Sequence, residues 1–216
     1  QRKAFERLSG DAPQSTLIAT GTGSGKTECF LLPILDYCLS MGKRPGVKAI
    51  LIYPMNALAT DQEKRVKELT ERIAALTGHE IRAGLYTGDT PDDVRREYQR
   101  VPPDILLTNY KMLDLLLLRP EDQKLWTANA PGVLRYLAVD ELHTFDGAQG
   151  TDLACLIRRL RDRLKIDDSL ACIGTSATIG GSPESLDDLC RYASSVFGTR
   201  FDRDAVILED RLSPKE

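Results

Sequence analysis

The sequence predicts an α/β fold with a mostly parallel central sheet, because three patterns agree. Short apolar runs typical of strands alternate with longer segments that repeat apolar residues at helical spacing. The short runs are continuously apolar, as in strands that are covered on both faces. A glycine-rich stretch separates the first apolar run from the first helical segment. Such alternation stacks as βαβ units, so a three-layer sandwich with helices on both faces of an open, mostly parallel sheet is expected.

Six strands are expected along the chain. The first is Thr16–Ala19, and the strongest spans residues 47–53, whose sequence VKAILIY is closed by a proline. The other apolar runs cover residues 81–86, 104–107, 134–139 and 170–174.

Three segments between these strands repeat apolar residues every three or four positions, the pattern of a helix with one buried face. The apolar stripes run from Phe30 to Cys38, from Leu58 to Leu76 and from Leu153 to Leu164. A fourth helix is expected to begin at Ser182 and Pro183 and to end near Val196.

The composition is that of one globular domain. The 216 residues include 29 basic and 32 acidic side chains, a net charge of −3, and 42% hydrophobic residues. This apolar content excludes a disordered chain, and no apolar run approaches the ~20 residues that cross a bilayer. We expect no membrane partner, a cytoplasmic location and reduced cysteines. Four cysteines, at 29, 38, 155 and 172, lie in apolar runs and are expected to be small core residues.

The glycine-rich stretch has the sequence of a phosphate-binding loop. Residues 20–27, TGTGSGKT, follow a strand and open a helix, which is the structural context of this motif. Glycines let backbone N–H groups approach phosphate oxygens, and a helix N-terminus favours anions. Lys26 supplies a charge for the phosphates, and the Thr27 hydroxyl is a candidate Mg²⁺ ligand. The alternative is a glycine-rich turn without a ligand. The expected nucleotide contacts are Thr22, Gly23, Ser24, Gly25, Lys26 and Thr27.

The strand expected at residues 134–139 ends in two adjacent carboxylates, Asp140 and Glu141. Such a pair is costly to place at the end of a buried strand unless it faces a metal or a polar cleft. The carboxyl ends of parallel strands line the ligand crevice. Asp140 is therefore the expected Mg²⁺ ligand, partly through water, and Glu141 is expected to orient and deprotonate the attacking water. The alternative is that Asp140 caps a helix. Together with Lys26, these residues are the candidate catalytic groups.

The two motifs together resemble the first RecA-like domain of a superfamily 2 helicase of the DExH type. Residues 53–62 (YPMNALATDQ) resemble motif Ia, residues 103–109 (PDILLTN) resemble motif Ib, and residues 176–178 (SAT) resemble motif III. Residues 86–91 (YTGDTP) and the segment after the acidic pair resemble the Lhr and MrfA-like branch. The sequence of motif Ia is similar to that of the large helicases of the DISARM and Druantia anti-phage systems. Thr20 stands where the strict loop pattern has glycine, a departure that superfamily 2 tolerates.

The resemblance implies roles for further residues. Gln1, which precedes the loop, would read the adenine edge of ATP, the alternative being a frayed terminal residue. His143, Ser176 and Thr178 would couple the nucleotide state to domain movement, although His143 could also be structural. For one of the implied nucleic-acid contacts, Gln62, a rim residue bonded to backbone is the alternative. The implied contacts to a nucleic-acid backbone are Pro54, Asn56, Gln62, Gly88, Thr108 and Asn109.

The implied function is that of an ATP-binding and ATP-hydrolysing lobe of a DNA helicase or translocase, with a suggested role in anti-phage defence. ATP and Mg²⁺ are the expected cofactors. Residues 1–200 would form this lobe, and residues 201–216 would begin the connection to a second RecA-like domain. The expected partners are DNA, that second domain and defence-system subunits. Two other classes stay open, namely a nucleotide-gated clamp that does not unwind nucleic acid and a small-molecule phosphotransferase. A phosphotransferase would leave the motif Ia residues without a function.

Overall fold

A computed structural model describes residues 1–21, 23, 25–177 and 183–209. Seven strands form one sheet in the order β3-β4-β2-β5-β6-β1-β7, and every pairing within the described part of the chain is parallel. The predicted parallel α/β sheet is therefore confirmed. The strands are β1 (Thr16–Ala19), β2 (Ala49–Ile52), β3 (Ala83–Tyr86), β4 (Ile105–Thr108), β5 (Tyr136–Val139), β6 (Ala171–Ser176) and β7 (Val206–Leu208).

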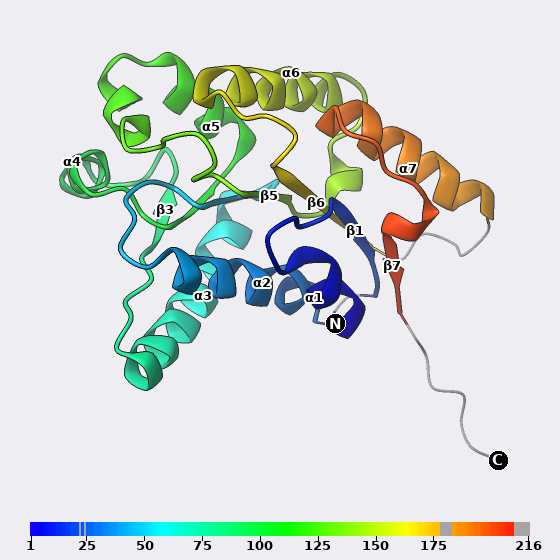
Figure 1. The fold of residues 1–216 in the computed structure, drawn as a ribbon. Coiled ribbons are helices and arrows are strands. Elements are labelled where there is room, and N and C mark those ends of the chain that lie inside the picture. Colours follow the sequence, from blue (N-terminus) through cyan, green and yellow to red (C-terminus); the bar gives the residue numbers. More distant parts are fainter. Residues whose placement is uncertain (22, 24, 178–182, 210–216) are drawn as a thin grey trace.

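Helices cover both faces of the sheet, which gives three layers (Figure 1). One face carries α1 (Arg2–Leu8), α2 (Lys26–Met41) and α3 (Asn56–Thr77). The other face carries α4 (Asp92–Arg100), α5 (Tyr110–Leu118), α6 (Gly147–Leu164) and α7 (Pro183–Phe197). Short 3-10 helices are η1 (Glu121–Trp126), η2 (Leu142–Thr144) and η3 (Arg203–Ala205). In the described part of the chain, no helix is both long enough and apolar enough to cross a membrane.

Each face of the sheet has its own hydrophobic core, because successive strand residues point to opposite sides. Ile50 and Ile52 of β2 join the core under α4 to α7, whereas Ala49 and Leu51 join the core under α1 to α3. All four residues are buried. The continuously apolar strand pattern is thus explained by helices on both sides.

Two sequence expectations about burial are wrong. The apolar stripe on α3 is buried at Val66, but Leu58 and Leu76 near its ends are 38% and 86% exposed. The 22 residues of α3 span about 33 Å, whereas a four-residue strand spans about 13 Å. The ends of α3 therefore extend beyond the sheet (Figure 1). Cys155 is also exposed, because it lies on the solvent side of α6.

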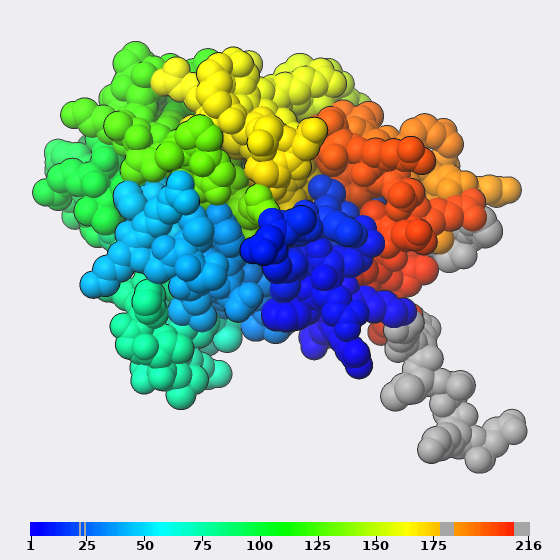
Figure 2. All heavy atoms as spheres, viewed as in Figure 1, coloured from blue at the N-terminus to red at the C-terminus, as the bar shows by residue number. Residues whose placement is uncertain are grey.

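The seventh strand lies beyond the boundary that we expected at residue 200. β7 pairs in parallel with β1, with Leu17 opposite Val206. Phe201, Ala205 and Ile207 are buried against the rest of the fold. Figure 2 shows the N-terminal segment and the segment around β7 next to each other on one face of the molecule. The sheet therefore includes residues as far as Leu208, although Val-Ile-Leu is too short a run to be recognised in the sequence.

Candidate nucleotide-binding site

Three strand ends bring the predicted catalytic residues together. β5, β6 and β1 are consecutive in the sheet, Lys26 opens α2 after β1, and Asp140 and Glu141 follow β5. Lys26 Nζ lies 3.0 Å from Glu141 Oε1 and 3.4 Å from the carbonyl oxygen of Ser176 at the end of β6. The Lys26 side chain is only 10% exposed. The lysine and the glutamate therefore form an ion pair that is largely shielded from solvent.

The loop before α2 has a backbone that requires glycine. Gly23 and Gly25 both have a φ of +80°, which L side chains rarely adopt. Gln1 lies against this loop, since a Cβ on Gly25 would stand 2.5 Å from Gln1 Nε2. Gln1 is therefore next to the loop, and its expected contact with adenine stays a prediction. Thr27 is half-buried in the first turn of α2. Thr22 and Ser24 lie outside the described residues.

One buried hydroxyl fixes both acidic residues. Thr175 Oγ1 donates a hydrogen bond to Asp140 Oδ1 at 2.5 Å and accepts one from the Glu141 N–H at 3.0 Å. Thr175 is fully buried in β6, so its position is set by the sheet. No sequence motif quoted above includes Thr175. A hydroxyl residue directly before Ser-Ala-Thr, at the end of an apolar strand, is the signal that could have found it.

Glu141 has a left-handed backbone, with φ 48° and ψ 50°. This conformation is uncommon outside glycine and is typical of functional sites, where it costs about 1–3 kcal/mol. Glu141 precedes η2 but makes no capping hydrogen bond with its side chain. Asp140, for which we considered a capping role, accepts the hydrogen bond from Thr175 instead. Both carboxylates are therefore held by the site rather than by a helix end.

His143 contacts both the second oxygen of Glu141 and the hydroxyl of Ser176. His143 Nδ1 lies 3.4 Å from Glu141 Oε2 and 3.1 Å from Ser176 Oγ. Ser176 is buried, whereas the His143 side chain is 43% exposed. A chain of polar contacts thus runs from Lys26 through Glu141 and His143 to the end of β6. The third expected coupling residue, Thr178, lies outside the described residues.

Burial raises the pKa of Asp140. Loss of water around the carboxyl is the largest cause and the negative charge of Glu141 adds to it, while Thr175 and Lys26 act in the opposite direction. Tyr53 is buried close by, and its hydroxyl has no hydrogen-bond partner among the described residues. Burial raises the pKa of Tyr53, and the charge of Asp140 raises it further. The carboxylate of Asp140 is therefore in surroundings that a bound cation would stabilise.

The donors at this edge fit a magnesium–nucleotide complex. Mg²⁺ prefers hard oxygen ligands, and it is usually held by one or two carboxylates together with phosphates and water. The Thr27 hydroxyl and the Asp140 carboxylate offer oxygen atoms of this kind. No cluster of three or more His, Cys, Asp or Glu that could hold a metal occurs in the described ranges. One hydroxyl and one carboxylate match the oxygen groups that Mg²⁺ takes together with phosphates and water.

The residues expected to contact nucleic acid follow β2, β3 and β4 at the same edge of the sheet. Asn109 Nδ2 donates to Asn56 Oδ1 at 2.7 Å, and Asn109 Oδ1 caps α5 by accepting from the Met112 N–H at 2.8 Å. Asn56 and Gly88 are exposed, and Pro54 and Asn109 are half-buried. The two asparagines thus join the ends of β2 and β4 into one polar surface.

Two of the expected contacts are less accessible than their sequence positions suggested. The Thr108 side chain is fully buried, and its hydroxyl donates to the carbonyl oxygen of Tyr86 at 2.7 Å. This hydroxyl links β4 to β3 rather than facing outward. Gln62 is half-buried, and its amide oxygen is buried without a hydrogen-bond partner among the described residues.

The Gly88 turn has a support that the sequence did not reveal. Arg95 Nη2 donates to the Gly88 carbonyl oxygen at 2.7 Å. The guanidinium carbon of Arg95 lies 5.7 Å from the centre of the Tyr86 ring, within the range of a cation–π contact. Arg95 therefore holds the turn against β3.

The fold and the strand-end site define a P-loop nucleoside triphosphatase domain of the RecA-like type. The family model described as DEAD/DEAH box helicase matches residues 1–186. The chain belongs to the DEAD/DEAH box helicase family and is the ATP-binding lobe of a helicase.

Relatives and solved structures agree with this assignment. The chain is 29% identical over 305 residues to the Druantia protein DruE of Escherichia coli, an alignment that covers 92% of this chain and 16% of that protein. It is 33% identical over 172 residues to an uncharacterized ATP-dependent helicase of Methanocaldococcus jannaschii, covering 79% of this chain and 24% of the relative. The structure of the DUF1998 helicase MrfA bound to DNA and AMPPNP matches with a TM-score of 0.73 and 26% identity, covering 97% of this chain and 26% of that one.

These matches confirm the predicted superfamily and the Lhr and MrfA-like branch. The chain spans about a quarter or less of the length of these relatives.

Proposed function

We propose that this lobe binds ATP with Mg²⁺, hydrolyses it, and drives movement of the parent protein along the backbone of DNA. The observation that carries the proposal is the meeting of Lys26, Asp140 and Glu141 at one sheet edge, with Thr175 fixing both acids. Gln1, beside Gly25, would read the adenine edge. The DNA-bound state of the similar helicase MrfA supports DNA as the partner.

The ion pair between Lys26 and Glu141 suggests how nucleotide binding prepares the site. Phosphate oxygens carry more charge than one carboxylate and would replace Glu141 as the partner of Lys26. Glu141, still oriented by Thr175 and His143, would then be free to take a proton from the attacking water. Thr27 and Asp140 would hold Mg²⁺, which when bound would neutralise charge on the phosphates. Binding of phosphate to Lys26 would thereby free Glu141 to act as the base.

The neighbouring strand ends supply the proposed nucleic-acid surface. Asn56, Gly88 and Asn109 would contact phosphates, with Pro54 and Gln62 beside them and Thr108 fixing the strand beneath. His143, Ser176 and Thr178 would transmit the nucleotide state to a second RecA-like domain. Phe201 to Leu208 are packed into the lobe described here. The proposed connection to the second domain would thus follow them, and residues 210–216 lie outside the described part.

The likeness to the Druantia protein DruE supports a role in anti-phage defence. Partner subunits of such a system would then be expected. The greater length of the relatives supports a second RecA-like domain in the parent protein.

Steady-state ATP hydrolysis by the whole protein, with and without single-stranded DNA, tests the proposal. We expect Lys26→Ala to abolish nucleotide binding, and Glu141→Gln to keep binding while losing about 10²–10⁴-fold in turnover. Glu71→Gln, which removes an exposed carboxylate on α3, is the matched control and should leave hydrolysis unchanged.

Strong stimulation by DNA would support a DNA-dependent motor. Nucleotide binding without stimulation would favour the nucleotide-gated clamp. Normal turnover in Glu141→Gln would remove Glu141 from its assigned role.

A further inference from the structure

A pocket of about 480 Å³ lies at the opposite edge of the sheet, where the strands begin. The loops that precede β2, β3 and β4 form most of its wall. These three strands are neighbours in the sheet, and each spans about 13 Å. The pocket is therefore separate from the nucleotide site and its adjoining surface. Its wall includes Lys43, Arg44, His79, Arg82, Arg100 and Val101.

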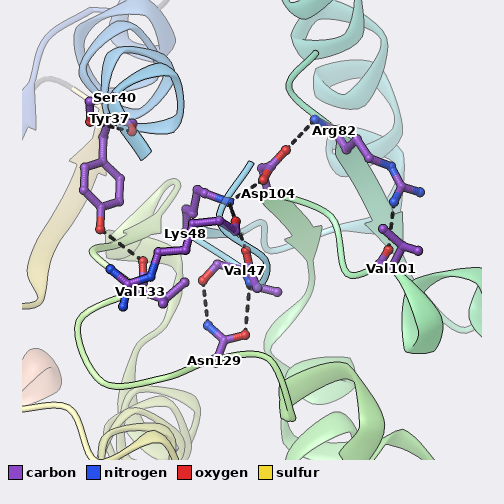
Figure 3. A network of polar contacts seen from close by, with 11 residues as sticks. Tyr37, Ser40, Val47, Lys48, Arg82, Val101, Asp104, Asn129 and Val133 are labelled. Atoms are coloured by element: carbon purple, nitrogen blue, oxygen red, sulfur yellow. Dashed lines mark hydrogen bonds and ion pairs between the residues drawn. The ribbon is translucent and has the colours of Figure 1, made fainter. Parts of the chain in front are cut away.

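A buried ion pair makes the rim of this pocket rigid (Figure 3). Lys48 is fully buried, and its Nζ lies 2.5 Å from Asp104 Oδ1 and 2.5 Å from the Arg44 carbonyl oxygen. The other oxygen of Asp104 accepts from the Arg82 N–H at 2.8 Å, and Arg82 Nη1 donates to the Val101 carbonyl oxygen at 3.1 Å. One carboxylate thus ties together the loops before β2, β3 and β4. A site held in this way loses little conformational entropy when a ligand binds.

Positive charge dominates the pocket. The side chains of Lys43, Arg44 and Arg100 are exposed and form no ion pair with another described residue. Of the two carboxylates on the wall, Asp104 is already paired with Lys48, which leaves Glu80 to oppose three cations. His79 adds a ring nitrogen, Nε2, that is buried and has no partner in the described part of the chain. The wall is therefore prepared for an anion.

The charge and the shape of the pocket favour a phosphate group over a single carboxylate. A phosphate monoester carries about −1.5 to −2 charges and three acceptor oxygens, which matches several cations better than one carboxylate does. The volume lies in the range of small-molecule sites. Val101, which is 53% exposed, and two prolines, Pro45 and Pro102, offer an apolar surface beside the cations. We propose that this pocket binds the phosphate of a nucleotide, either free or at the end of a nucleic-acid strand.

Calorimetric titration of the whole protein carrying Lys26→Ala, which is expected to abolish nucleotide binding at the loop, tests the proposal. The probes are a 5′-phosphorylated dinucleotide, the same dinucleotide with a 5′-hydroxyl, and AMP. We expect the phosphorylated dinucleotide to bind about tenfold or more tightly than the hydroxyl form. Equal binding of AMP would identify free nucleotide as sufficient, and preference for the dinucleotide would identify a strand end.

A pair of charge-matched variants locates the binding. Arg44→Gln with Arg100→Gln should remove the preference for the phosphorylated form, whereas Lys64→Gln with Arg72→Gln on the exposed side of α3 should keep it. Loss of the preference in both variants would overturn the proposal, as would its survival in both. Equal affinity for the phosphorylated and hydroxyl dinucleotides in the protein with Lys26→Ala alone would also overturn it, even if the double variants do not fold. Binding of an acidic peptide in place of phosphate would assign the pocket to a protein partner instead.

Discussion

Thr175 performs two tasks with a single hydroxyl group. Its donor side holds the Asp140 carboxylate and its acceptor side holds the Glu141 N–H. A buried hydroxyl that is satisfied in both directions is costly to replace, because both partners lose a hydrogen bond in a partly buried site. The strained backbone of Glu141 is thereby held in place by its neighbour in the sheet.

We expect Thr175→Val, which conserves the shape of the side chain, to lower kcat for ATP about 10–100-fold, as supporting residues around metal and catalytic groups commonly do. Thr175→Ser should restore most of the rate, because it restores the hydroxyl. The Mg²⁺ concentration that gives half-maximal hydrolysis should rise in the valine variant and return to its original value in the serine variant. Full activity with an unchanged Mg²⁺ requirement in Thr175→Val would show that the two hydrogen bonds do not position the acids.

Asp140 makes the folded protein less stable at neutral pH. Its pKa in the folded state is raised, chiefly by burial, so the folded state holds the proton more tightly than the unfolded state. The free energy of unfolding therefore falls as the pH rises through these pKa values.

Asp140→Asn removes this ionisation and should raise the Tm at pH 7 by a few degrees, since about 1 kcal/mol corresponds to about 2–4 °C in a chain of this size. The difference in Tm from the unmodified protein should shrink as the pH falls towards about 4, where the carboxyl of the unfolded chain is about half protonated as well. Thermal unfolding between pH 4 and 8 measures this. A Tm difference that grows towards acid pH would contradict the direction assigned to the pKa.

At the scale of the elements, the sequence predicts well which residues lie at the carboxyl ends of the strands. Because the carboxyl ends of parallel strands lie at the same side of the sheet, Lys26 and Glu141 come together although 115 positions separate them. Burial follows the predicted apolar stripes along α2 and α6, which are buried from Phe30 to Cys38 and from Leu153 to Leu164. α3 departs from the pattern at both ends, where it extends beyond the sheet.

Side-chain partners at the strand ends could not be predicted in the same way. The direction of the Thr175 and Thr108 hydroxyls depends on which residues of the neighbouring strands lie beside them. This register is set by the packed sheet and leaves no local pattern in the chain. The same reason applies to the pocket at the other edge, where Asp104 joins loops that are distant in sequence.

On the scale of the whole molecule, polar sites lie at both ends of the parallel strands, the carboxyl edge and the amino edge of the sheet. Its carboxyl edge carries the nucleotide site and the proposed nucleic-acid surface. Its amino edge carries the cationic pocket, whose rim is fixed by the Lys48–Asp104 pair. Both edges share β2 and β4, so the two sites are connected through strands that are buried on both faces.

The extent of this sheet gives a prediction about where the lobe ends. β7 pairs with β1 along the end of the sheet, and the side chains of Phe201 and Ile207 are 5% and 6% exposed. Burial of two such side chains contributes about 3–6 kcal/mol, a large part of the ~5–15 kcal/mol that stabilises a typical domain. Removal of β7 would also leave β1 as an unprotected edge strand, which promotes aggregation.

We therefore expect a chain that ends at residue 200 to lose at least about 10 °C in Tm or to aggregate, whereas a chain that ends at Glu209 should match the 216-residue chain. Thermal unfolding followed by circular dichroism, together with light scattering, distinguishes these results. An equal Tm for all three chains would place the boundary at residue 200 and show that β7 contributes little. A loss of Tm confined to the shortest chain would place β7 inside the ATP-binding lobe. The sheet would then need β7 to protect β1 from becoming an exposed edge strand.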